Sequence, residues 1–284
     1  MVMMAKKNNH LRPLGEILSR YDFQKDKYIS REFQKYGYDL ARVLGDLENR
    51  SLYIKLAKEE PRAVLEKIKF SVLESKAANK KKLFLWKLGQ YHWQEKLEKG
   101  RLKKTFFKKN PDKVARELLG QILVAIDEKG ILRAGQITET EAYFGQEDLA
   151  SHARFGKKGR ARAMWGLPGT AYIYLIYGLY TMFNVVAHPE KEAGAVLIRA
   201  LKPVVGGKGT VACGPAKLTT WLKITLDQNG ENLARSSRLW IAGGEKVKKE
   251  RIANGPRIGV EYADKWAKKP LRFWVRRSRY VSKN

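Results

Sequence analysis

Apolar residues recur at helical spacing through the first third of the chain. Two sets of positions follow this spacing: Leu11, Leu14, Ile17 and Leu18, then Val64, Leu65, Ile68, Val72 and Leu73. Pro61 suits the first position of the second helix, because its missing N–H needs no partner there. We therefore expect a small all-helical bundle in this part of the chain.

From Thr105 onward, short apolar runs alternate with turn residues, which is typical of β-strands. The expected strands cover residues 122–126, 131–143, 171–176, 185–187 and 195–201. Helical spacing returns at residues 114–119 and 215–224. Because strands and helices do not alternate regularly, the pattern predicts an α+β domain rather than a doubly wound fold. We expect a curved, mostly antiparallel, open-barrel-like sheet flanked by helices.

Glycine content changes where the pattern changes. Residues 1–104 contain 5 glycines and residues 105–284 contain 19. A turn-poor segment followed by a turn-rich one indicates two parts. We therefore expect a basic helical extension over residues 1–104 and a single mixed domain over residues 105–284.

Charge narrows the class of partner. The chain has 57 Lys and Arg against 29 Asp and Glu, a formal net charge of +28, which attracts polyanions. Both parts are basic, with a net +12 in residues 1–104 and +16 in the remainder. Nucleic acid is the leading partner, and the extension is a hypothetical added grip on DNA. Charge alone also fits a ribosome-associated or merely soluble basic protein.

The sequence offers no metal, disulfide or membrane signal. Cys213 is the single cysteine, and the four histidines lack metal-ligand spacing. The first residues lack the apolar core of a signal peptide, and the longest apolar stretch, residues 171–187, is short for a membrane span. We expect no metal, no cofactor and no membrane association. The expected location is cytoplasmic, nucleoid-associated in a prokaryote, or nuclear in a eukaryote.

The strand expected over residues 131–143 carries candidate chemistry. Its alternation places Glu139, Glu141 and Tyr143 on one face. For an isolated Glu-x-Glu the usual interpretation is a surface strand whose acids pair with lysines. The alternative is a carboxylate that activates water against a glycosidic bond.

A cluster of tyrosines follows. Tyr172, Tyr174, Tyr177 and Tyr180 lie within nine residues, downstream of a basic run at residues 154–162. Such stripes are more often core, but buried phenols need polar partners, which favours the wall of a cleft. Aromatic planes and a wedge are what an enzyme needs to hold a base extruded from the duplex. Gly178 suits a tight turn that presents Tyr177 at a tip.

Taken in order, short motifs from about residue 105 to the C-terminus make the chain resemble the alkyladenine (3-methyladenine) DNA glycosylase family. They are Ala-Arg-Glu-Leu-Leu-Gly at 115–120, Glu-Thr-Glu-Ala-Tyr at 139–143, Glu-Asp at 147–148, Ser-His at 151–152, Pro-Gly-Thr at 168–170, Tyr-Gly-Leu-Tyr at 177–180, Asn184, Leu-Ile-Arg-Ala-Leu at 197–201, Gly-Pro-Ala-Lys-Leu at 214–218, Arg-Ile-Gly at 257–259, and Trp-Ala-Lys-Lys-Pro-Leu-Arg-Phe at 266–273. Residues 1–104 resemble no family that we can name.

The resemblance implies a role for each site residue. Glu141 is the general base that activates water, Arg199 helps to place that water, and Glu139 is an accessory acid. The remaining roles concern the base: Tyr143 and Tyr174 stack on it, His152 lies at its edge, Asn184 excludes normal guanine, and Tyr177 is the intercalating wedge.

The implied reaction is hydrolysis of the N-glycosidic bond of a damaged purine in double-stranded DNA by a monomeric base excision repair enzyme. The lesions are of the 3-methyladenine, 7-methylguanine, hypoxanthine and ethenoadenine type, and the product is an abasic site in an unbroken strand. None of the residues to which the resemblance gives a role in the pocket is a lysine that could form a Schiff base, which indicates a monofunctional enzyme. Two alternatives stay open: a noncatalytic DNA- or RNA-binding protein that retains the pocket, and a sugar hydrolase that uses Glu139 and Glu141 as a pair.

Overall fold

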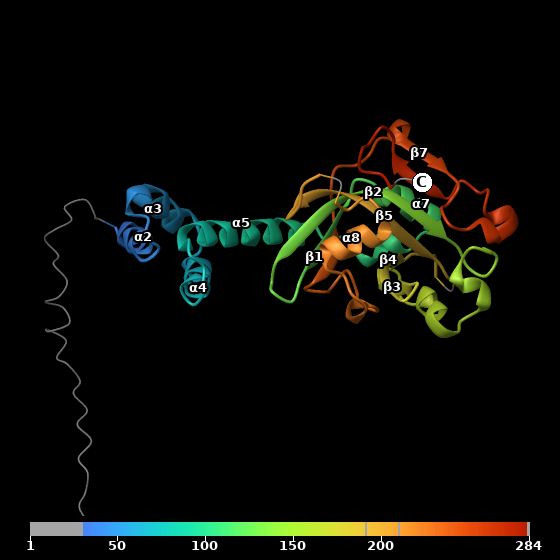
Figure 1. Ribbon diagram of the computed structural model, residues 1–284, viewed down its shortest axis with the longest axis horizontal. Helices are drawn as coiled ribbons and strands as arrows, with labels where there is room; N and C mark the ends of the chain where they lie inside the picture. The colour runs from blue at the N-terminus through green and yellow to red at the C-terminus, as the bar shows by residue number, and fades with distance from the viewer. Residues whose placement is uncertain (1–30, 191, 210, 283–284) are drawn as a thin grey trace, which may run out of the picture. The chain divides into compact units, whose positions relative to one another are not determined.

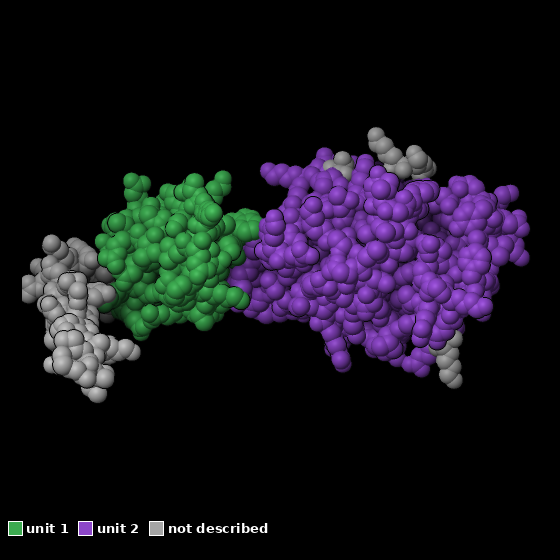
Figure 2. Space-filling model, turned by 60° about the horizontal axis from the view of Figure 1, so that its bottom comes forward, with its two compact units in different colours: residues 1–89 green, residues 90–284 purple. Residues whose placement is uncertain are grey.

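The computed structural model describes residues 31–190, 192–209 and 211–282, and the chain divides into two compact units. Figure 2 colours residues 1–89 and 90–284 as these units. The division falls inside helix α5 (Lys80–Lys99), whereas the sequence-based boundary lies further along, between residues 104 and 105.

The first unit is helical, as the sequence predicts. It contains α2 (Glu32–Val43), the short 3-10 helix η1 (Leu47–Asn49), α3 (Arg50–Glu59), α4 (Arg62–Leu73) and the start of α5. The helix expected over residues 64–73 is confirmed as α4, with Pro61 at its N-cap and not inside its first turn. The expected helix with Leu11, Leu14, Ile17 and Leu18 lies outside the described residues.

The second unit is built on an open antiparallel sheet, which confirms the α+β prediction. Its strands run in the order β3-β4-β5-β2-β1-β6, and β8 pairs with both β2 and β7. Figure 1 labels β1 to β5 and β7 of this sheet. The strands are β1 (Ile122–Ile126), β2 (Leu132–Tyr143), β3 (Ala171–Ile176), β4 (Tyr180–Val186), β5 (Ala195–Val205), β6 (Leu239–Ala242), β7 (Ile252–Gly255) and β8 (Arg272–Val275). Strands β1 and β3 have the predicted bounds, β4 and β5 are longer than predicted, and β6 to β8 were not predicted.

Helices cover one face of this sheet and form the main core with it. They are α7 (Pro111–Leu118) and α8 (Pro215–Leu222), and the short α6 (Lys104–Phe107), which precedes α7, adds Phe107 to the same core. In α7 the residues Val114, Ala115 and Leu118 point into the core, as the apolar spacing predicts. The remaining turns are the 3-10 helices η2 (His152–Phe155), η3 (Gly159–Trp165), η4 (Leu226–Gln228), η5 (Lys249–Arg251) and η6 (Glu261–Trp266).

A β-bulge at Thr138 changes which face the residues of β2 occupy. Thr138 is an extra residue in the pairing of β2 with β5. Before the bulge the odd-numbered Ile137 lies in the main core, and after it the even-numbered Ala142 does. Strict alternation would have put Ile137 on the same face as Glu139 and Glu141. The bulge therefore separates the apolar half of the strand from its polar half.

A second bulge, at Arg199, changes which face of the sheet the residues of β5 occupy. Arg199 is the extra residue between the partners of Glu139 and Thr140. Ile198 and Leu201 both lie in the core although their numbers differ in parity, and Leu197 and Arg199 line a cavity on the opposite face. The two bulges together leave a polar region on the face of the sheet that α7 and α8 do not cover.

The loop between α7 and β1 makes a close backbone approach that allows a matched test. Gly120 and Gly130 both have a positive φ, at 88° and 72°, but a Cβ on Gly120 would lie 2.0 Å from the carbonyl oxygen of Glu245, whereas a Cβ on Gly130 meets nothing within 4 Å. We expect G130A to lower the free energy of unfolding by about 1 kcal/mol and G120A by about 3 kcal/mol or more. Urea unfolding followed by tryptophan fluorescence measures both. Equal losses would contradict the close approach.

Candidate active site

A cavity of about 640 Å³ opens on the polar face of the second unit. Strands β2 to β5, the hairpin between β3 and β4, the 3-10 helices η2 and η3, and the loop before η6 build its wall. The residues that line it include Tyr143, His152, Arg160, Tyr172, Tyr174, Tyr177, Asn184, Leu197, Arg199, Ile258 and Tyr262. All predicted site residues except the two glutamates, Glu139 and Glu141, are therefore among its lining residues.

Glu141 lies directly behind this wall and is 0% exposed. Its Oε2 accepts a hydrogen bond from the Tyr143 hydroxyl at 2.8 Å, and its Oε1 accepts one from the Ile258 main-chain N–H at 2.9 Å. The guanidinium of Arg199 approaches the same Oε1 at 3.2 Å. Since an ionised carboxylate offers about four acceptor positions, Glu141 keeps about one for a further donor.

Glu139 is also 0% exposed, but it accepts more hydrogen bonds than Glu141. Its Oε1 accepts from Arg199 at 3.1 Å, from Arg272 at 2.7 Å and from the Ser282 hydroxyl at 2.8 Å. Its Oε2 accepts from the Ser282 main-chain N–H at 2.6 Å. Three of these four hydrogen bonds fall on Oε1, and two arginines neutralise the charge, so Glu139 is a structural anion in this arrangement.

Arg199 joins the two carboxylates to the cavity. The bulge in β5 aims its side chain at Glu139 through Nε and at Glu141 through Nη1. Burial by itself lowers the pKa of Arg199, but the charges of Glu141 and Glu139 outweigh burial and raise it. The guanidinium thus stays cationic where it faces the cavity.

A second buried ion pair holds the loop that carries Ile258. Arg257 donates to both oxygens of Asp148, at 2.6 Å and 2.8 Å, and to the carbonyl of Ala142 at 2.8 Å. Its guanidinium also lies over the ring of Tyr143, 4.7 Å from the centroid. Arg257 and Asp148 lie in motifs with no role assigned from the sequence. The structure shows that they fix the backbone around Glu141.

Three aromatic rings pack against one another in the wall of the cavity. The rings of His152 and Tyr174 meet edge to face, with 4.8 Å between their centroids. The centroid of the Tyr172 ring lies 5.3 Å from that of Tyr174. The Tyr172 hydroxyl lies 2.8 Å from Nδ1 of His152. Burial, followed by the charge of Glu141, raises the pKa of Tyr174 to about 12, so the phenol stays neutral. Tyr172 is the ring that orients His152, a function that its place in the tyrosine run does not reveal.

The histidine in this stack is neutral at physiological pH. Burial and the nearby Arg160 and Arg154 lower the pKa of His152 to about 4. A neutral ring leaves one nitrogen as a donor and the other as an acceptor. His152 is half-buried and lines the cavity, so it is not a core histidine.

Tyr177 stands at the tip of the hairpin between β3 and β4. Its side chain is 85% exposed and its φ is +54°, which is rare for a bulky residue. Gly178 follows with φ +67°, and the Leu179 N–H closes the turn on the Ile176 carbonyl at 3.1 Å. Two successive positive φ values are typical of tight hairpin turns, and here they project an aromatic ring beside the cavity.

Asn184 lies on β4, 3% exposed, in the wall of the cavity. Its Nδ2 donates to the carbonyl of Tyr172 at 3.1 Å. Only the amide nitrogen can donate to a carbonyl, so this contact settles the orientation of the side chain. Asn184 is thus a strand residue held in place and not a turn cap.

Two further residues in or near the cavity had no signal in the sequence. Tyr262 lines the cavity from the loop before Trp266 and is 61% exposed. Ser282 reaches Glu139 across 143 positions of the chain, a contact that local spacing does not reveal.

Within residues 31–190, 192–209 and 211–282, no group of three His, Cys, Asp or Glu is arranged to hold a metal ion. No helix in these ranges is long and apolar enough to cross a membrane.

Comparison with known proteins places this site in a family context. Residues 105–279 match the family model described as "Methylpurine-DNA glycosylase (MPG)". A protein of Myxococcus xanthus (strain DK1622) named "Putative 3-methyladenine DNA glycosylase" is 45% identical over 183 residues, 64% of this chain and 93% of that protein. Proteins with the same name are 41% identical in Methanocella arvoryzae and 38% identical in Clostridium tetani, again over 64% of this chain and over 96% and 99% of theirs.

The lowered pKa of His152 predicts a pH dependence of stability. The unfolded chain binds this proton near pH 6.5 and the folded protein near pH 4. The stability that depends on neutral His152 is therefore fully present above about pH 6.5 and is lost as the pH falls toward 4. We expect the Tm of the wild type to fall more steeply than that of H152Q between pH 6.5 and 4. Thermal unfolding across this range measures it, and parallel curves would contradict it.

Proposed function

This chain belongs to the methylpurine-DNA glycosylase family, and from that membership we propose that it flips a damaged purine out of duplex DNA and hydrolyses its N-glycosidic bond. The family resemblance predicted from the sequence motifs is confirmed, and the protein is a DNA glycosylase of base excision repair. The proposed lesions are of the 3-methyladenine, 7-methylguanine, hypoxanthine and ethenoadenine type, and the proposed product is an abasic site.

The observation that carries the proposed mechanism is the different hydrogen-bonding state of the two glutamates. Glu139 accepts four hydrogen bonds, and its partners Arg272 and Ser282 lie outside the cavity lining. Glu141 accepts two, from Tyr143 and Ile258, and pairs with Arg199, and all three of these partners line the cavity. Glu141 is thus the carboxylate that can take a proton from water. In the proposed mechanism it acts as the general base, and Arg199, which touches it and lines the cavity, places the water.

The flipped purine is proposed to lie between Tyr143 and Tyr174. Each stacking contact with a base contributes about 1–3 kcal/mol. Arg257 fixes the ring of Tyr143 from its far side, and His152 and Tyr172 fix Tyr174. Both planes are therefore held by neighbours before a base enters, which reduces the entropy lost on binding.

His152 is proposed to lie at the edge of the base. An N-alkylated purine carries positive charge, and a protonated imidazole beside it would repel it. Burial and Arg160 and Arg154 keep His152 neutral, so the site admits a cationic lesion as well as neutral hypoxanthine. A neutral imidazole also offers a hydrogen bond to a ring atom of either base.

Asn184 is proposed to discriminate against undamaged guanine. Its amide is held by the Tyr172 carbonyl, so the side chain cannot turn away from an exocyclic amino group. A base with that group would meet a fixed wall. Discrimination of this kind works by making the wrong substrate costly to bind.

Tyr177 is proposed to fill the gap that the flipped base leaves in the duplex. Its exposure, its position at a turn and its place at the cavity edge suit a wedge. The exposed Leu179, on the same hairpin, adds apolar surface next to it.

The two alternatives from the sequence predict different groups in the site. A sugar hydrolase needs two carboxylates that both reach the substrate, and Glu139 is occupied by Arg199, Arg272 and Ser282. A noncatalytic binder does not need an acceptor position on Glu141. Among the described residues no lysine lines the cavity, which supports a monofunctional enzyme.

The proposal extends to the organisation of the chain. Residues 105–284 form the glycosylase domain, in keeping with a family match that begins at residue 105, and residues 1–104 are a basic helical extension. The enzyme is proposed to act as a monomer on double-stranded DNA, in the cytoplasm or the compartment that holds the chromosome.

The general base is tested by E141Q. Glutamine keeps the size of the side chain but removes the basic oxygen, so we expect the excision rate to fall by about 10²–10⁴-fold. The assay uses a duplex with one hypoxanthine or ethenoadenine, followed by alkali to cleave abasic sites. E128Q, in the exposed turn between β1 and β2, is the matched control and should keep the wild-type rate. Full activity of E141Q would exclude Glu141 as the base, and a wild type that binds lesion DNA without forming abasic sites would favour the noncatalytic binder.

The wedge is tested by Y177S. Loss of the ring leaves the duplex gap unfilled, so we expect about a 10-fold lower single-turnover rate on duplex DNA, with the fold intact because the side chain is exposed. The same lesion in single-stranded DNA is the control, since no gap needs filling there. Unchanged rates on duplex, or equal losses on both substrates, would rule out the wedge.

A further inference from the structure

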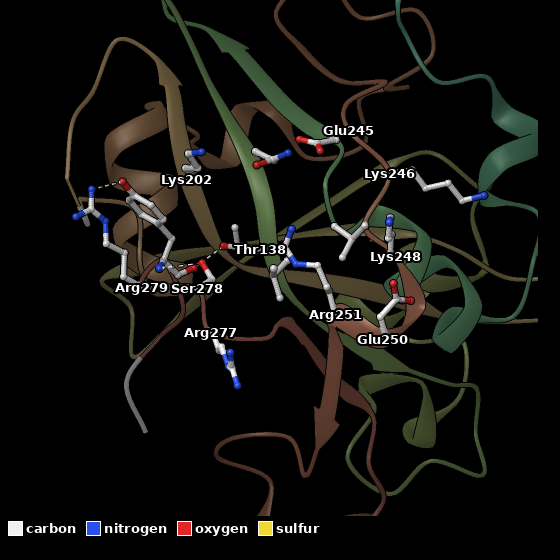
Figure 3. Close-up of a pocket in the computed structure, with 14 residues that line it drawn as sticks. Thr138, Lys202, Glu245, Lys246, Lys248, Glu250, Arg251, Arg277, Ser278 and Arg279 are labelled. Atoms are coloured by element: carbon white, nitrogen blue, oxygen red, sulfur yellow. Dashed lines mark hydrogen bonds between the residues drawn. The ribbon is translucent and has the colours of Figure 1, made fainter.

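The last described residues of the chain run along the polar face of β2. After β8, the hydroxyl of Thr138 donates to the main-chain carbonyl of Tyr280, and the Tyr280 N–H donates to the Ser278 hydroxyl at 3.1 Å. Figure 3 shows Thr138 and Ser278 with these bonds as dashed lines. The outer side of this segment lines a second cavity of about 630 Å³ whose lysines and arginines are exposed. The bulge at Thr138 thus anchors the segment formed by residues 278–282.

The inner end of this segment is Ser282, which is 8% exposed and contacts the buried ion cluster. Its main-chain N–H and its hydroxyl donate to the two oxygens of Glu139, at 2.6 Å and 2.8 Å. Its Oγ also lies 3.4 Å from Nη2 of Arg199, which donates to it. The hydroxyl is therefore a donor to the acid and an acceptor for the arginine at once.

These hydrogen bonds continue through Arg199 to Glu141, the proposed general base. Ser282 holds Glu139, Glu139 holds Nε of Arg199, and Nη1 of Arg199 lies 3.2 Å from Glu141. Arg199 thus has its three nitrogens directed at Glu139, Glu141 and Ser282. A guanidinium fixed at three points keeps one orientation toward the cavity. Ser282 lies beyond residue 279, where the family match ends.

We propose that Ser282 is a positioning residue for excision: its hydroxyl, held by the segment 278–282, orients Arg199 and Glu139 so that Arg199 places the attacking water for Glu141. The proposal rests on the proposed function of the site. Ser282 itself does not line the cavity, so it acts through Arg199 and not on the substrate. Alanine lacks the group that both donates and accepts, whereas threonine retains it.

The experiment uses full-length S282A, S282T and S278A on a duplex with one hypoxanthine or ethenoadenine. S278A is the matched control. It removes a hydroxyl from the same segment, and that hydroxyl accepts a hydrogen bond from the Tyr280 N–H and does not contact Glu139 or Arg199. We expect S282A to lower the single-turnover rate at saturating enzyme by about 10-fold, as loss of one hydrogen bond to a charged group predicts. The Kd for lesion DNA should stay within about 2-fold, and S282T and S278A should retain the rate within about 2-fold.

A double-mutant cycle with R199Q separates positioning from a general effect on folding. If Ser282 acts through Arg199, S282A should change the rate of R199Q by less than about 2-fold. An equal loss in both backgrounds would overturn the proposal, as would an S282A enzyme whose rate per folded molecule equals the wild type. A change in Kd with an unchanged single-turnover rate would overturn it too. If the wild type forms no abasic site, the proposed function itself fails, and that result is read before any variant is compared.

Discussion

The structure depends on neutralising three carboxylates that are removed from water. Glu139, Glu141 and Asp148 are each 0% exposed, and burying a carboxylate without partners is among the most costly changes in a protein. Three arginines, Arg199, Arg257 and Arg272, supply the opposite charges. In buried pairs of this kind, removing one partner costs about 3–5 kcal/mol, because the other charge stays unpaired. The elements around the site are arranged to keep these pairs intact.

Several irregular features of the fold serve this requirement. The bulge at Thr138 turns Glu139 and Glu141 away from the apolar core and also anchors the segment 278–282. The bulge at Arg199 directs its guanidinium at both acids. Strand β8 brings Arg272 to Glu139, and Arg257 fixes the loop that donates an N–H to Glu141. One face of the sheet packs against α7 and α8 to form the core, and the opposite face carries the candidate site.

The same arrangement separates rigid from exposed parts of the site. The rings of Tyr143 and Tyr174, which are proposed to hold the base, are contacted by Arg257 and by His152 respectively. Tyr177 stands in a strained backbone conformation, exposed at the tip of a tight turn. Strain of this kind persists where the surrounding structure holds it, here the paired strands β3 and β4.

The sequence by itself determined the features that depend on local pattern. Alternation predicted β1, β3 and the shared face of Glu139, Glu141 and Tyr143, helical spacing predicted α4 and α7, and ordered motifs predicted which residues surround the cavity. It missed β6, β7 and β8, because four-residue strands are too short to show a period.

Only the tertiary structure decided which partners hold each buried carboxylate. That outcome depends on Ser282, 143 positions from Glu139, and on Arg257, 109 positions from Asp148. Bulges also reverse the facing of Ile137 and Leu201, which alternation assigns wrongly. The contacts of Ser282 and Arg257 and the two bulges escape the sequence for one physical reason. Hydrogen-bond partners of a buried charge are chosen by packing between distant segments, and spacing along the chain does not record them.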